Sequence, residues 1–253
     1  MIGKTHIVGG ITLATAGLCI CAVSDLNNTQ SYFAYKNLFP VGMLIGSALG
    51  SLLPDIDHEG STISKKLKLV AKVTSKATSH RGITHTLLGW LVYSLITIGL
   101  ASLLYNNFNT STKIITSLFC VFSLFLGVNY IFNGINKIKR IKKLTEKKYI
   151  AVVLLIALVS IIDIAKPSIL FYFLLGEAIG SSVGYFSHLL LDMFTYSKVS
   201  VLYPITKRKF GIGIVRTNSE GEYVFRNVLW CMEAIAVVIY FIILFKCWIV
   251  WGI

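Results

Sequence analysis

Long apolar runs separated by short polar segments dominate this chain. The pattern predicts seven membrane-spanning helices, at roughly residues 5–23, 38–53, 85–105, 113–132, 149–165, 168–191 and 228–251. A helical span needs about 20 apolar residues, so the second and fifth runs require tilt or local thinning of the bilayer. None of the runs alternates with the period of two that a barrel strand shows. We therefore expect an all-α, polytopic transmembrane helical bundle, with residues 1–253 forming a single domain.

Composition and charge agree with a membrane protein. Hydrophobic residues make up 55% of the chain and charged residues 14%, whereas soluble domains carry roughly 25% charged residues. The net charge of +13 would suggest nucleic-acid binding in a soluble chain. Cytoplasmic loops of membrane proteins collect Lys and Arg, so we predict no nucleic-acid partner.

The basic residues also predict how the chain is oriented. With the N-terminus inside and seven alternating spans, the inside segments are 1–4, 54–84, 133–148 and 192–227, and they hold 20 of the 24 Lys and Arg residues. This bias follows the positive-inside rule. A cleavable signal peptide is the alternative interpretation of the first run, which starts after Lys4 and is followed by small residues.

Three features are expected within the inside segments. Residues 62–77 and 135–148 have the pattern of basic amphipathic helices lying on the inner leaflet. Ordinary positive-inside charge on a solvated face is the alternative for both. Residues 210–226 contain two short strand-like pieces around an Asn-Ser-Glu-Gly sequence, which predicts a small cytoplasmic hairpin.

All five histidines fall at the inner ends of the predicted spans, together with three aspartates. The set comprises His6, His58, His80, His85, His188, Asp55, Asp57 and Asp192. His188 and Asp192 are four residues apart and share a helical face. An isolated pair of this kind is usually a hydrogen-bonded interfacial pair, and an isolated Asp-x-Asp is usually a turn or cap. The combined pattern predicts a metal site for Zn, Mn or Fe, because imidazole and carboxylate suit these ions.

Three further charged positions are candidates for function. Arg81 lies between two of the histidines and could clamp a phosphate oxygen with two hydrogen bonds; its alternative is one more positive-inside charge. Glu177 lies 11 residues before His188 on the same face, and Glu233 lies near the inner end of the last span. Ionisable groups inside the bilayer are costly and often functional.

Four motifs carry a resemblance to a known family. They are "THIVGG" (5–10), "GSLLPDIDH" (50–58), "SHRGITHT" (79–86) and "GYFSHLLLDMFT" (184–195). Together they resemble the YdjM-like family of bacterial and archaeal inner-membrane proteins, which are predicted metal-dependent hydrolases. The resemblance runs from residue 5 to about residue 226. "RTNSEGEYVFR" (216–226) is similar to a Thr-Gly-Ser…Glu element of that family, with Asn218 where Gly is usual.

The resemblance extends distantly to zinc-dependent phospholipase C, and it implies a set of ligands. These are His6, Asp55, His80, His85, His188 and Asp192. His58 is implied less strongly as a further ligand or an outer partner. Asp57 is implied as an outer partner or a base. Two or three divalent ions are expected, zinc first, with Mn or Fe as alternatives.

The sequence thus predicts a membrane-embedded metal-dependent hydrolase in a bacterial or archaeal inner membrane, with its site facing the cytoplasm. The expected substrate is a lipid or lipid-linked phosphoester, cleaved by metal-activated water, with Asp57 and Arg81 as catalytic candidates. A cation-transport or metal-handling protein is one alternative. A noncatalytic membrane protein with a structural metal site is another. The oligomeric state is left open.

Overall fold

Five long helices and two short 3-10 turns make up the described part of the chain. The computed structural model describes residues 1–27, 38–57, 61, 64, 82–106 and 167–251. The helices are α1 (Gly3–Asn27), α2 (Phe39–Gly50), α5 (Leu87–Asn106), α8 (Pro167–Met193) and α9 (Glu220–Trp251), and the turns are η1 (Leu53–Asp57) and η2 (Ile83–His85). The described residues form no strand, only two isolated β-bridges. The all-helical prediction is confirmed for this part of the chain.

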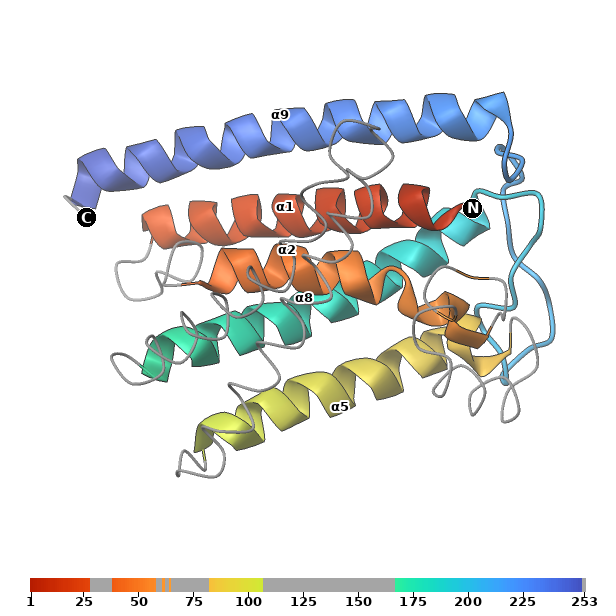
Figure 1. Cartoon of the computed structure of the whole chain (residues 1–253), viewed down its shortest axis with the longest axis horizontal. Helices are drawn as coiled ribbons and strands as arrows, with labels where there is room; N and C mark the ends of the chain where they lie inside the picture. The colour runs from red at the N-terminus through yellow and green to blue at the C-terminus, as the bar shows by residue number, and fades with distance from the viewer. Residues whose placement is uncertain (28–37, 58–60, 62–63, 65–81, 107–166, 252–253) are drawn as a thin grey trace, which may run out of the picture.

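The helices lie roughly side by side, and α8 is central among them (Figure 1). It contacts α2 most extensively and also packs against α1 and α5, while α9 lies along α1. The N-terminus, η1, the start of α5 and the end of α8 meet at one end of the bundle (Figure 1). Polar residues from segments distant in sequence are therefore brought together at that end.

Glycines allow α2 and α8 to approach closely. Three glycines on each helix, spaced by four residues, face the partner helix: Gly42, Gly46 and Gly50, and Gly176, Gly180 and Gly184. A Cβ on any of these would overlap a backbone carbonyl of the other helix. Small residues at this spacing are typical of helix contacts in membranes, where backbone packing replaces the hydrophobic effect as the driving force. This contact fixes the register between α2 and α8.

Three described helical segments are long and apolar enough to cross a membrane. They are Gly3–Ser24, Phe39–Asp57 and Glu220–Cys247, and Leu87–Leu103 is a shorter apolar helix. Large apolar side chains of α9 are exposed, for example Ile235, Phe241 and Phe245. Such a surface would be costly in water, and it suits contact with lipid acyl chains.

The predicted spans are supported only in part. Five of the seven coincide with helices α1, α2, α5, α8 and α9, although only three candidate spans are found within the described residues. The predicted spans at 113–132 and 149–165 lie outside the described residues. So do the predicted amphipathic helix 135–148 and all of 62–77 except Ser64.

The predicted hairpin at 210–226 is wrong. Residues from Glu220 onward belong to α9. Ser219 and Glu222 cap the start of α9 in a variant of the capping box. The backbone N–H of Glu222 donates to the Ser219 hydroxyl, and the Glu222 carboxylate accepts from the backbone N–H of Asn218, one residue before the cap. Asn218 has φ +60, a conformation that Asn tolerates better than most residues. Helix capping therefore overrode the strand-like pattern of the residues that follow.

Candidate metal centre

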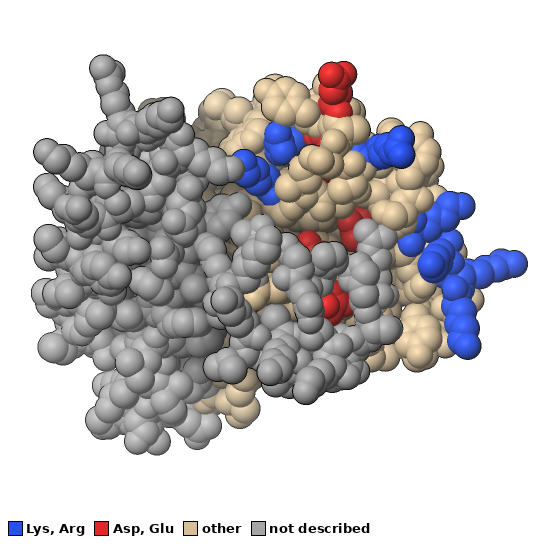
Figure 2. Space-filling view, turned by 45° about the vertical axis from the view of Figure 1, so that its right-hand side comes forward, with Lys and Arg blue, Asp and Glu red and all other residues tan. Residues whose placement is uncertain are grey.

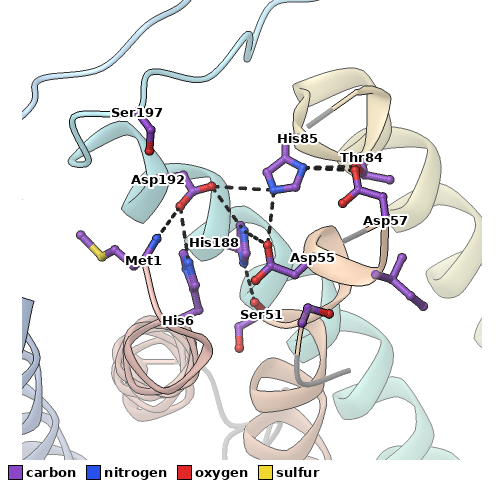
Figure 3. A network of polar contacts seen from close by, with 12 residues as sticks. Met1, His6, Ser51, Asp55, Asp57, Thr84, His85, His188, Asp192 and Ser197 are labelled. Carbon is purple, nitrogen blue, oxygen red and sulfur yellow. Dashed lines mark hydrogen bonds and ion pairs between the residues drawn. The ribbon is translucent and has the colours of Figure 1, made fainter. Parts of the chain in front are cut away.

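Five potential metal ligands from four elements meet at one end of the bundle (Figure 3). Two groups have their ligand atoms within 4.8 Å of one another: His6 with His188 and Asp192, and Asp55 with His85 and His188. His188 belongs to both groups. The sequence-based prediction that these five side chains converge agrees with this geometry.

Asp192 lies between three imidazoles. Its Oδ1 is 3.4 Å from His6 Nε2. Its Oδ2 is 3.5 Å from His188 Nε2 and 3.8 Å from His85 Nε2. His188 and Asp192 reach the same point because they are one helical turn apart on α8.

Asp55 closes the cluster on the other side. Its Oδ1 lies 3.6 Å from His85 Nε2 and 3.7 Å from His188 Nε2. The Asp55 side chain is 27% exposed, whereas those of His85, His188 and Asp192 are at most 3% exposed. Asp55 is therefore the most accessible of these side chains.

The backbone at the end of α2 sets the tautomer of His188. Pro54 lacks the N–H that would extend the helical hydrogen bonding of α2, and the chain turns into η1. The carbonyl of Ser51 accepts a hydrogen bond from His188 Nδ1 at 2.7 Å. Because a carbonyl only accepts, the Nδ1 atom carries the proton, so Nε2 of a neutral His188 presents a lone pair to the cluster.

The donor set fits a metal ion. Nε2 of His188 is buried and has no hydrogen-bond partner within the described part of the chain, as is also true of His6 Nδ1. The ligand separations of 3.4–3.8 Å exceed ordinary hydrogen-bond lengths. Zinc bonds of 2.0–2.1 Å in tetrahedral geometry would separate two ligand atoms by roughly 3.3 Å. Three imidazoles and two carboxylates at these spacings could hold one ion or two neighbouring ions.

Asp57 lies behind His85 rather than beside Asp55. Its Oδ2 is 3.8 Å from His85 Nδ1 and accepts a hydrogen bond from the Thr84 hydroxyl at 2.7 Å. The Tyr185 hydroxyl donates to the Thr84 carbonyl at 2.5 Å, which ties η2 to α8. The Thr84 hydroxyl also lies 3.2 Å from His85 Nδ1. Asp57 therefore suits an outer partner that orients His85 through Thr84, in the place where a carboxylate commonly supports a histidine ligand.

A second set of contacts, which the sequence analysis missed, holds the N-terminal end of α1. The Glu222 carboxylate accepts hydrogen bonds from the backbone N–H of Ile2 at 2.6 Å and from the Thr5 hydroxyl at 2.8 Å. The terminal amine of Met1 lies 3.2 Å from Asp192 Oδ1. These contacts position His6. The Ser-x-x-Glu spacing of the capping box was the available signal for Glu222.

The other candidate residues of the sequence fall into two groups. His58, His80 and Arg81 fall outside the described residues. Glu233 accepts a hydrogen bond from Thr15 at 2.9 Å. Thr15 lies nine residues beyond His6 on α1, or about 13 Å along the helix, so Glu233 joins α9 to α1 away from the cluster. Glu177 is buried against α2, where its backbone contacts Gly46.

The fold and the site define a helical membrane protein with a buried histidine–carboxylate cluster at one end of its bundle. The family model described as YdjM inner membrane protein matches residues 1–252. The chain therefore belongs to the YdjM inner membrane protein family, as its four motifs predicted.

Individual relatives match over shorter stretches. The protein YvsG of Bacillus subtilis (strain 168) is 39% identical over 97 residues, which cover 38% of this chain and 51% of YvsG. The inner membrane protein YdjM of Escherichia coli (strain K12) is 46% identical over 48 residues, or 19% of this chain and 24% of that protein. The chain thus matches about half of YvsG and a quarter of YdjM. No solved structure matches this chain.

Proposed function

We propose that this protein is a membrane-embedded metal-dependent hydrolase that cleaves a phosphoester of a lipid or lipid-linked substrate. One observation carries the proposal: five side chains that could ligate a metal converge in a buried cluster, in which His188 presents an Nε2 lone pair between two carboxylates. Its place at the end of apolar helices favours a substrate that reaches the site from the membrane surface.

The proposed cofactor is two or three divalent ions, zinc first, with Mn or Fe compatible with the same donors. Bound ions would polarise a phosphoryl oxygen and lower the pKa of a water ligand to about 7. The chain's own residues have separate tasks. Asp192 and His188 hold the centre of the cluster, Asp55 lines its accessible side, and Asp57 fixes the ring of His85.

The proposal also includes the sequence-based predictions for three further residues, for the number of spans and for the orientation in the membrane. Arg81 clamps a phosphate oxygen of the substrate, and His58 and His80 complete the ligand set. The chain crosses the membrane about seven times with its N-terminus inside. The site then faces the cytoplasm, since the positive-inside rule assigns the histidine-bearing ends to that side.

Metal analysis and an activity assay on one preparation test the proposal. Detergent-purified full-length protein should contain bound zinc and hydrolyse phospholipid phosphoesters, followed by release of phosphorylated headgroup or phosphate. The double variant His188→Ala, Asp192→Ala should lose both metal and activity. Glu233→Gln, which changes a buried carboxylate away from the cluster, should keep both. Unchanged hydrolysis in the double variant would refute the assignment.

A structural metal site is favoured by one observation, the nearly complete burial of His6 and His188. Structural zinc sites are closed, whereas catalytic sites keep an open position. Under this alternative, chelation would lower the melting temperature of a protein that has no hydrolytic activity to lose.

Cation transport or metal handling is favoured by the buried acid Glu177 within α8. Ligands of transporters usually lie near the bilayer midplane, whereas this cluster lies at one end of the bundle (Figure 1). Zinc flux into proteoliposomes, measured with an enclosed fluorescent indicator, separates this alternative from hydrolysis.

A further inference from the structure

The loop between α8 and α9 has an unusual surface. Residues 194–219, here called the basic loop, contain five basic residues and no acidic residue. The basic residues are all exposed: Lys198, Lys207, Arg208, Lys209 and Arg216. Figure 2 shows lysine and arginine side chains projecting along one side of this end of the molecule.

Large apolar side chains are exposed on the same loop. Ile205 is 89% exposed, and its neighbours Leu202 and Tyr203 are 37% and 41% exposed. Tyr196, Ile212 and Ile214 are each more than 60% exposed. Single exposed apolar residues are ordinary, but a cluster rimmed by polar residues marks a contact surface.

The backbone of the basic loop is nonetheless well anchored. Val199 and Phe210 exchange two backbone hydrogen bonds, and the Leu87 N–H at the start of α5 donates to the Val201 carbonyl. Val199, Val201 and Val215 are buried. The loop thus turns these valines inward and presents residues 202–209 outward, so the exposed apolar side chains are held there by the fold.

We propose that residues 202–209 insert into the headgroup region of an anionic membrane, beside the metal centre. The occupant of this surface is the bilayer in which the protein itself resides. The loop runs directly into α9, in which Glu220–Cys247 is a candidate membrane span, so the loop lies within reach of the bilayer surface. Apolar side chains interleaved with Lys and Arg bind interfaces by combining acyl-chain burial with attraction to anionic headgroups. The basic loop carries five positive charges and no acidic residue, so its charge complements that of an anionic lipid.

The insertion also brings lipid headgroups towards the metal centre. Thr195, at the start of the loop, follows Asp192 by three residues, and its hydroxyl donates to the Asp192 carbonyl at 2.7 Å. The loop therefore begins where the cluster ends. This inference concerns membrane contact and stands whether or not the protein proves to be a hydrolase.

A fluorescent probe at position 205 tests the proposal in full-length protein. The five native cysteines are replaced, Ile205→Cys is introduced, and the residue is labelled with an environment-sensitive nitrobenzoxadiazole group. The protein is reconstituted into nanodiscs of phosphatidylcholine, either alone or with about 30% phosphatidylglycerol, which gives a clearly anionic surface. We expect a blue-shifted emission and quenching by doxyl-labelled lipid, both stronger in the anionic nanodiscs.

Two matched variants complete the design. The same probe at Thr217, which is exposed among polar residues of the loop, should report water in both membranes. Replacing Lys207, Arg208 and Lys209 with Gln should remove the dependence on phosphatidylglycerol. A probe at position 205 that remains in water in both membranes would overturn the proposal. So would a lipid dependence that survives the loss of the three charges.

Discussion

The imidazole rings of His6 and His188 stack face to face, with centroids 3.7 Å apart and 13° between the ring planes. Two positive charges at this distance would repel strongly in a buried site, so the stack disfavours protonation of both rings together. Metal ligation requires neutral imidazole. The pairing of α1 with α8 therefore favours states in which at least one of the two rings is neutral and can offer a lone pair to a metal ion.

The first prediction concerns Asp192, which lies near all three imidazoles. Asp192→Asn keeps the shape of the side chain but removes the charge and one strong ligand. We expect zinc affinity to fall by more than the ~10–100-fold typical of losing an outer partner. Competition with a chelator of known affinity, followed by metal analysis of the purified protein, measures the change. Glu233→Gln is the matched control, and an equal loss in that variant would contradict the assignment.

The second prediction separates Asp57 from the ligands. Because Asp57 contacts Nδ1 of His85, Asp57→Asn should weaken zinc binding by about 10–100-fold without abolishing it. Thr97→Val is the control, since within the described part of the chain the Thr97 hydroxyl bonds only to carbonyls of its own helix. Zinc titration of both variants gives the comparison. Complete loss of metal in Asp57→Asn would instead make Asp57 a direct ligand.

Local spacing carried much of the information about the site. The one-turn separation of His188 and Asp192 placed both on one face, and Pro54 marked the end of a helix just before Asp55. The Lys and Arg bias placed all the histidines at one end, and α1, η1, η2 and α8 bring His6, Asp55 and His85 to that end beside His188 and Asp192. These features depend on neighbours in sequence and on the shared ends of helices, so they could be predicted.

Features that depend on long-range packing could not be predicted from the sequence. Glu222 bonds to Ile2 across 220 positions of the chain, and no local pattern links the two. The resemblance left Asp57 as an outer partner or a base, and only the packing of η1 against η2 shows that the carboxylates of Asp55 and Asp57 lie at different edges of His85. The start of α9 was missed because apolar residues after Gly221 fit a strand as well as a helix.

The third prediction concerns the cap that holds α1. Glu222 is buried and accepts three hydrogen bonds, from Ile2, Thr5 and Asn218. Glu222→Ala leaves these donors unsatisfied, and we expect a loss of about 2 kcal/mol or more in stability. Because α1 carries His6, weaker zinc binding should accompany this loss of stability. Thermal unfolding in detergent and zinc titration measure both effects.

Glu220→Ala provides the control for Glu222. Glu220 lies in the same first turn of α9 and carries the same charge, but it is exposed. Its removal should change stability by no more than about 0.5–1 kcal/mol, through the helix dipole. Equal effects of the two substitutions would mean that the charge at the helix terminus matters, and not the hydrogen bonds to α1.

The fourth prediction tests whether the α2–α8 contact holds the metal centre together. A Cβ at Gly46 would overlap the backbone of Glu177, so Gly46→Val should force the helices apart and cost at least about 1–3 kcal/mol. Separation would also draw the Ser51 carbonyl from His188 and weaken zinc binding.

Gly99→Ala is the matched substitution, because a Cβ there meets no atom of the described residues within 4 Å. It should leave zinc affinity unchanged and be neutral or slightly stabilising, as Ala is a better helix former than Gly. Thermal unfolding and zinc titration of the two variants measure both effects. If Gly46→Val bound zinc as tightly as Gly99→Ala, the glycine contact would serve helix packing alone, and the position of His188 would have to be set by α1 and η1.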